Sequence, residues 1–175
     1  KSNYQPRARC VLERSQHLAR KGLYPVRTAH MDMSVELPFA PVDSIIRAQA
    51  GDLRVSADAT EELAQRIQSH GAEVAISAAE QAATDNRKTL MAEDFGVEQV
   101  VSRREVTLPI APIDRIARLE IDSQYRVSMD ARIALADILE EYATNVAEGA
   151  AILARHADRR TVQAEDIQTY FSLFE

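Results

Sequence analysis

The sequence predicts an all-α protein in which two copies of a short–long–short helical unit pack on each other. Three motifs occur twice in the same order: LPFAPVDSII (37–46) and LPIAPIDRIA (108–117), RVSADA (54–59) and RVSMDA (126–131), RKTLMAED (87–94) and RRTVQAED (159–166). The 175 residues include only five glycines and six prolines and no tryptophan, a composition that favours helices over sheet. A motif set that recurs at near-constant spacing indicates a duplicated structural unit.

Each unit is expected to open with a short helix. A proline pair stands at its start, Pro38 and Pro41 or Pro109 and Pro112, where a helix has N–H groups to spare. Polar residues around Gly51, or around Asp122 and Ser123, are expected to end it.

A long helix follows in each unit. Ser56 and Ser128 are predicted N-caps, and Asp58 and Asp130 suit the positive end of a helix dipole. Apolar residues then recur every three or four positions, which predicts helices of about 27 residues. A third helix is expected after Thr89 and after Thr161.

The long helix cannot cover its apolar stripe with two short helices alone, so each unit needs a partner. A short connection lets the second unit serve as that partner at high effective concentration. The predicted organisation is a basic extension (1–33), a first unit (34–101), a linker (102–107) and a second unit (108–175), with the two units forming one intramolecular pair.

The charge is unevenly distributed along the chain. Residues 1–32 hold seven basic side chains against Glu13 and Asp32, and the remainder holds 14 basic against 25 acidic side chains. The opening segment is expected to be a disordered basic arm, a targeting segment, or an extension that precedes a true start at Met33. The single cysteine, Cys10, excludes an intrachain disulfide and fits a reducing cytoplasm. The acidic, lysine-poor remainder is typical either of a protein adapted to concentrated salt or of an ordinary acidic protein.

The repeated LPxAP, RVS, and RKT or RRT followed by AED resemble the archaeal histones, and two such units in one chain resemble the doublet histones of salt-loving archaea. The resemblance covers residues 36–174. It implies two tandem histone folds packed as an intramolecular dimer, whose loops and first-helix ends grip double-stranded DNA.

The resemblance also implies DNA-binding residues. Arg54 and Arg126 match the family arginine that enters the minor groove of DNA. An arginine there binds through the negative potential of the groove and does not need to recognise the base sequence. Residues that match phosphate-binding positions are Lys88, Thr89, Arg160 and Thr161. Arg115 matches a DNA-facing arginine of the first helix, and the first repeat has Ser44 there. Each position could instead hold an ordinary solvated side chain.

The resemblance implies two further kinds of contact. Arg87 with Asp94, and Arg159 with Asp166, are expected to form structural salt bridges. His156 is expected to meet Asp166 of a second chain, beside Leu153, in a four-helix contact. The first repeat has Thr84 and Gln81 in place of His156 and Leu153, so two chains are expected to associate through their second repeats only. His156 could also be a plain surface residue.

The leading functional hypothesis is a histone that bends or wraps double-stranded DNA with little sequence specificity, in the cytoplasm on the chromosome. The alternatives are a transcriptional regulator acting at selected loci and a histone-fold scaffold that binds only proteins. No cofactor, metal, membrane span or small-molecule substrate is expected. The four histidines show no metal-ligand spacing and no glycine-rich phosphate loop is present, so an enzyme is not expected.

Overall fold

The computed structural model describes residues 35–174, and the predicted basic extension lies outside the described residues. The first repeat comprises α2 (Phe39–Ala50), β1 (Arg54–Val55), α3 (Ala57–Thr84), β2 (Thr89–Leu90) and the 3-10 turn η1 (Ala92–Phe95). The second comprises α4 (Ile110–Ala117), β3 (Arg126–Val127), α5 (Met129–His156), β4 (Thr161–Val162) and α6 (Ala164–Phe174). The predicted all-α class with two tandem units is confirmed.

The two long helices start where the sequence predicts. The hydroxyl oxygens of Ser56 and Ser128 accept hydrogen bonds from the backbone N–H groups of Ala59 and Ala131, both at 3.1 Å. Each cap satisfies one of the N–H groups that a helix start leaves without an intrahelical partner. Both helices run for 28 residues, close to the expected length.

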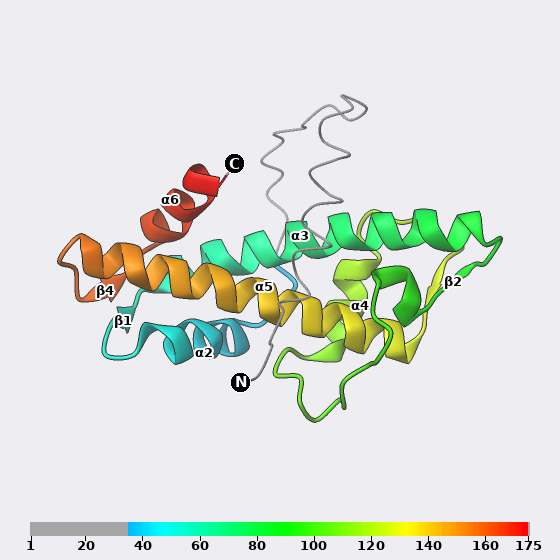
Figure 1. The fold of residues 1–175 in the computed structure, drawn as a ribbon, viewed down its shortest axis with the longest axis horizontal. Helices are drawn as coiled ribbons and strands as arrows, with labels where there is room; N and C mark the ends of the chain where they lie inside the picture. The colour runs from blue at the N-terminus through cyan, green and yellow to red at the C-terminus, as the bar shows by residue number, and fades with distance from the viewer. Residues whose placement is uncertain (1–34, 175) are drawn as a thin grey trace, which may run out of the picture. The chain divides into compact units, whose positions relative to one another are not determined.

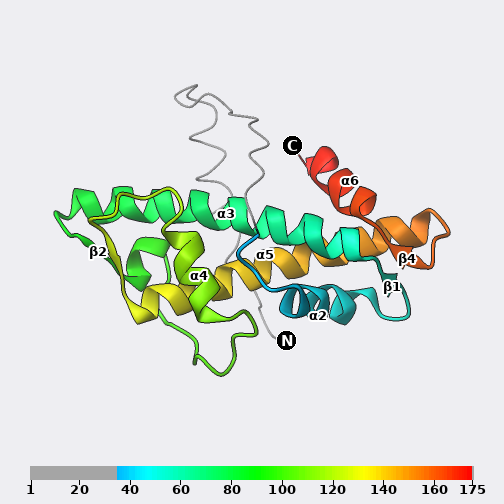
Figure 2. The same ribbon diagram turned by 180° about the vertical axis from the view of Figure 1, so that it is seen from behind.

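The repeats share one hydrophobic core. Helices α3 and α5 run antiparallel beside each other (Figures 1 and 2), and α2, α4 and α6 each pack on both of them. The core is formed by side chains of both repeats, including Ile46, Leu63, Ile67, Ile113, Ile116, Leu135, Leu139 and Ile167. At Gly71 of α3 a Cβ atom would lie 2.7 Å from Ile116 and 3.0 Å from Leu139, so the close packing of the two repeats depends on the missing side chain.

The third helix of the first repeat departs from the prediction. After β2 the chain makes one 3-10 turn and stops at Gly96, which has a left-handed φ of 75°. The second repeat has Gln168 at the equivalent position and continues as the 11-residue α6. Glycine adopts positive φ at little cost and commonly ends helices. The predicted third helix is therefore wrong for the first repeat beyond its first turn.

Helix α6 is fixed to both long helices by aromatic side chains. The guanidinium of Arg66 on α3 lies 4.6 Å from the ring centroid of Phe171, and Gln168 donates a hydrogen bond to Glu62 at 3.2 Å. Next to them, His70 of α3 stacks on Tyr142 of α5, with centroids 4.1 Å apart. Burial lowers the pKa of His70.

Candidate nucleic-acid interface

The predicted DNA-binding loops of different repeats are joined by short parallel strands. Strand β1 pairs with β4, which sets Arg54 opposite Thr161, and strand β2 pairs with β3, which sets Thr89 opposite Arg126. In the first pair the Arg54 N–H donates to the Arg160 carbonyl at 2.9 Å; in the second the Arg126 N–H donates to the Lys88 carbonyl at 2.9 Å. The structure therefore gathers six predicted DNA residues into two clusters, which we call ladder end 1 (Arg54, Arg160, Thr161) and ladder end 2 (Arg126, Lys88, Thr89).

The cationic side chains of both ladder ends are exposed. Arg54, Arg126, Lys88 and Arg160 face solvent, and the two threonines are half-buried. Within residues 35–174, none of these four cations forms a salt bridge. An exposed cation without an acidic partner is available to a phosphate or to the negative potential of a minor groove. Each ladder end can thus present one arginine beside a hydroxyl and a second cation.

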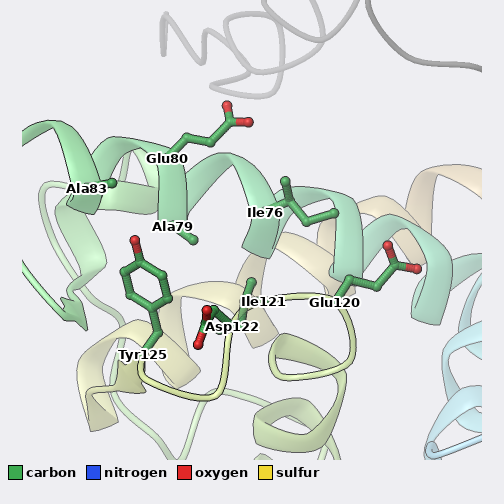
Figure 3. Close-up of a pocket in the computed structure, with 8 residues that line it drawn as sticks. All are labelled: Ile76, Ala79, Glu80, Ala83, Glu120, Ile121, Asp122 and Tyr125. Atoms are coloured by element: carbon green, nitrogen blue, oxygen red, sulfur yellow. The ribbon is translucent and has the colours of Figure 1, made fainter.

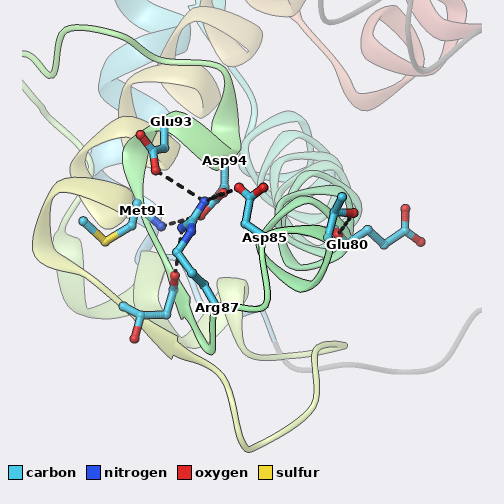
Figure 4. Close-up of polar contacts among 8 residues, drawn as sticks. Glu80, Asp85, Arg87, Met91, Glu93 and Asp94 are labelled. Carbon is cyan, nitrogen blue, oxygen red and sulfur yellow. Dashed lines mark hydrogen bonds and ion pairs between the residues drawn. The ribbon is translucent and has the colours of Figure 1, made fainter.

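Two clamps hold the loops that carry Lys88 and Arg160. Arg87 donates hydrogen bonds to both carboxylate oxygens of Asp94, at 2.6 and 2.9 Å (Figure 4), and Asp94 also accepts the Met91 N–H at 2.7 Å. Hydrogen bonds to Asp94 and then to Asp85 raise the pKa of Arg87, so its charge is secure. The Asp94 side chain is fully buried.

The second clamp repeats this arrangement. Arg159 pairs with Asp166, whose other oxygen accepts the Gln163 N–H at 2.9 Å. Charge-assisted hydrogen bonds of this kind fix a loop conformation. Arg87 and Arg159 are both paired with an aspartate of their own repeat. The residue that follows each of them, Lys88 or Arg160, is therefore the one available to bind an external anion.

Arg115 has a partner that the sequence did not indicate. Its Nε donates to the Glu36 carboxylate of the first repeat, although more than half of the Arg115 side chain stays exposed. At the equivalent position of the first repeat, Ser44 donates to the Ala40 carbonyl at 2.8 Å. The charge of Arg115 is thus already partly neutralised within the chain.

Arg118 and Arg132 were also missed at the level of sequence. Both pair with Asp114, at 3.1 and 3.0 Å. Arg132 donates to the Val127 carbonyl at 3.0 Å, and Arg118 donates to the Tyr125 carbonyl at 3.3 Å. These two carbonyls flank Arg126, so the network supports the loop that presents it. The first repeat has Thr60 in place of Arg132, and this one-sided difference was the available signal.

The residues expected in the inter-chain contact are differently placed. His156 is exposed at the end of α5 and Leu153 is half-buried one turn before it. Asp166 is only 1% exposed, and both its oxygens are engaged in its own loop. Asp166 therefore belongs to the clamp of its own chain. Its expected contact with His156 of a second chain stays a prediction.

The described residues contain no group of His, Cys, Asp or Glu side chains placed to hold a metal ion. Among them there is also no helix with the length and apolar character needed to cross a membrane.

The two helical repeats pack on each other along their antiparallel long helices, and short parallel strands pair their loops. This arrangement defines an intramolecular pair of histone folds. The sequence matches the family described as histone-like transcription factor (CBF/NF-Y) and archaeal histone twice, over residues 35–99 and 106–169. The chain belongs to this family, and its two matched units make it a doublet histone. The family is one of DNA-associated chromatin proteins and not of enzymes.

Individual relatives agree with this membership. One of the subunits of the archaeal histone HAN1 of Thermococcus zilligii is 56% identical over 61 residues, which are 35% of this chain and 88% of that protein. Probable archaeal histone 3 of Methanocaldococcus jannaschii is 43% identical over 61 residues, with the same two coverages.

Solved structures are similar across both repeats. The histone from Methanopyrus kandleri superposes with a TM-score of 0.58 and 29% identity, covering 75% of this chain and 90% of its own. A protein from Thermus thermophilus has a TM-score of 0.60 and 15% identity, covering 79% of this chain and 97% of its own, and shows a shared fold alone.

Proposed function

We propose that this protein binds double-stranded DNA at the two ladder ends, largely without sequence specificity, and bends or wraps it as part of a chromosome. The observation that carries the proposal is the cross-repeat pairing of Arg54 with Thr161 and of Arg126 with Thr89. One arginine at each end enters a minor groove, while Lys88 or Arg160 and the neighbouring threonine bind phosphate.

The spacing of the contacts sets the length of DNA. Two ladder ends with Arg115 between them provide three contact points. A minor groove faces a histone surface about every 10.2 bp in nucleosomes, so one chain engages about 30 bp.

The acidity of the chain predicts an unusual salt dependence. Outside residues 1–32 acidic side chains outnumber basic ones, so general attraction to DNA is weak. Release of counterions normally supplies much of non-specific affinity and fades at high salt. Binding must then rest on direct hydrogen bonds and groove insertion, which favours flexible DNA and is compatible with action at selected loci.

The test compares the full chain with the Arg54→Ala, Arg126→Ala double variant on a duplex of about 60 bp, across a KCl series from about 0.1 M to molar concentrations. We expect saturable binding that the double variant loses at every salt concentration. A matched control, Arg103→Ala with Arg104→Ala, removes the same charge from two exposed linker arginines and should bind normally. Circular dichroism at each point verifies the fold.

A protein-binding scaffold is the second candidate, favoured by the acidic surface and by the neutralisation of Arg115 by Glu36. A scaffold would remain folded and ignore DNA throughout the series.

We further propose that two chains associate through their second repeats. The contact would use the end of α5, with Leu153 and His156, together with α6. The first repeat has Gln81 and Thr84 at these positions and a single turn, η1, instead of a third helix. One-sided association of this kind gives a pair of chains and stops further stacking.

A further inference from the structure

A groove between the two repeats is lined by residues other than those of the ladder ends. It has a volume of roughly 240 Å³ and runs between the second half of α3 and the loop that joins α4 to β3. Figure 3 shows the Tyr125 ring standing towards Ala79 and Ala83, with the Asp122 carboxylate beside it and Ile121 facing Ile76. Glu120 extends from the same loop towards α3.

The equivalent place, between the end of α5 and the loop that joins α2 to β1, is filled by an arginine of the chain itself. Arg155, near the end of α5, donates through Nη2 to the Ala50 carbonyl at 2.8 Å, at the end of α2. Its guanidinium lies so close to Gly51 that a Cβ there would be 3.3 Å from Nη2. The loop after the short helix of this fold therefore accepts a guanidinium from the long helix of the other repeat.

At this groove α3 of the first repeat lacks the arginine, and the loop of the second repeat that faces it carries Glu120 and Asp122. Aligning the motifs places Ala83 at the position of Arg155, and the methyl side chain of Ala83 leaves the groove open. In the loop, Asp122 stands at the position of Gly51 and Glu120 at that of Gln49. With the same offset, Asp52 corresponds to Ser123, so this loop has one more carboxylate than its counterpart, and the groove has no internal arginine to face it.

Two of the carboxylates that line the groove, those of Glu120 and Asp122, are not paired with a cation within the described residues. Both side chains are exposed. Burial, and then repulsion by Glu120, raise the pKa of nearby Glu73 on α3. A cation bound here would relieve that repulsion as well as pair with the two loop carboxylates.

The walls of the groove favour a guanidinium over an ammonium group. Guanidinium is planar, stacks on aromatic rings and is weakly hydrated, so the Tyr125 ring and the apolar wall of α3 suit it. A carboxylate such as Asp122 can accept two parallel hydrogen bonds from it. Lysine offers a compact, strongly hydrated charge that gains little from such walls.

We propose that this groove binds an arginine side chain supplied by an arginine-rich segment of another protein, in the place equivalent to that of Arg155. The histone pair then carries a protein-docking site between its two repeats, formed by residues other than those of the ladder ends. DNA is not needed for this interaction, so it can be tested independently of DNA binding.

The first test uses a fluorescein-labelled peptide of alternating glycine and arginine, with the full chain in about 0.5 M KCl to screen general attraction. We expect saturable binding by fluorescence anisotropy, and at least tenfold weaker binding of the same peptide with lysine for arginine. Absence of saturable binding, or equal binding of the two peptides, would overturn the proposal.

The second test changes the groove. The Glu120→Gln, Asp122→Asn variant should bind the arginine peptide about tenfold less tightly or worse, because hydrogen bonds to charged groups contribute about 1.5 kcal/mol or more each. Its matched control, Asp52→Asn with Glu141→Gln, removes the same charge from two exposed sites elsewhere and should bind normally. An equal loss of peptide binding in both variants would show that the peptide is held by general electrostatic attraction, and would overturn the proposal that it binds in the groove.

The third test closes the groove without removing an acid. Ala83→Arg restores the internal arginine, so the variant should lose peptide binding while its thermal midpoint stays equal or rises. A folded Ala83→Arg protein that binds the peptide as well as the unmodified chain would contradict the proposed position of the ligand.

Discussion

Arg54 lies directly opposite Thr161, its partner across a parallel ladder between the two repeats, and donates its backbone N–H to the Arg160 carbonyl at 2.9 Å. This relationship couples folding to function, because neither repeat alone can assemble a complete ladder end. Loss of the pairing between repeats would separate Arg54 from Arg160 and Thr161, which we propose act together on DNA.

The Arg87–Asp94 clamp should contribute measurably to stability. Asp94→Asn removes the charge from a fully buried side chain and leaves Arg87 without its main partner, so we expect a loss of about 2 kcal/mol or more. Urea denaturation followed by circular dichroism measures it. Glu93→Gln, on a side chain that is 72% exposed in the same turn, should change the free energy of unfolding by about 0.5 kcal/mol or less. Similar losses in both variants would argue against the clamp.

Glu36 should weaken DNA binding by occupying Arg115. Glu36→Gln releases that guanidinium for a phosphate, so we expect severalfold tighter DNA binding at low salt. The slope of log K against log salt concentration should become steeper by up to about 0.9. Electrophoretic mobility shifts across a KCl series measure both quantities. The gain should vanish in the Glu36→Gln, Arg115→Ala double variant; a gain that persists there would come from general charge and not from Arg115.

His70 should make the fold sensitive to acid. Burial lowers its folded-state pKa below the ordinary value of 6.5, so the unfolded chain binds more protons in the window between the two values. The contribution of His70 to stability is complete above pH 6.5 and decreases as the pH falls through that window. The thermal midpoint of the unmodified chain should therefore fall more between about pH 7 and 5 than that of His70→Gln. An equal fall of the thermal midpoint in both proteins would show that groups other than His70 cause the acid sensitivity. Glu73 and Glu140 would not be those groups: their pKa values are raised, so their contributions to stability increase as the pH falls.

Association between chains should depend on the end of the second repeat. The Leu153→Gln, His156→Thr variant carries the first-repeat residues at both positions, so we expect it to lose the two-chain species on DNA while one-chain binding persists. Sedimentation velocity with a duplex of about 60 bp distinguishes the species, because this length has room for two chains at the proposed length of about 30 bp each. The reciprocal variant, Gln81→Leu with Thr84→His, should not create a second interface, since α6 has no counterpart in the first repeat. Two-chain complexes in the first variant would refute one-sided association.

The repeat was the main reason why the fold could be predicted from the sequence. Each motif was read twice, so Ser56 and Ser128 supported each other as N-caps, and both caps are present. The third helix of the first repeat is predicted too long, because the AED motif is the same in both repeats and indicates a helix start in each. Gly96, whose left-handed conformation ends the turn, is the residue that distinguishes the first repeat.

Side-chain contacts between the repeats were less predictable. Glu36 and Arg115 are 79 positions apart, and no local pattern links them. The groove beside Ala83 was equally hidden, because an absent side chain becomes informative only when the structure shows Arg155 filling the equivalent place.

The most direct test of DNA bending by the two ladder ends measures energy transfer between dyes at the ends of a duplex of about 30 bp, which is nearly rigid when free. Saturating full-length protein should raise the transfer efficiency, and the Arg54→Ala, Arg126→Ala variant should leave it at the value of free DNA. Binding of the unmodified chain without any change in transfer would contradict the proposal that the two ladder ends and Arg115 together bend DNA.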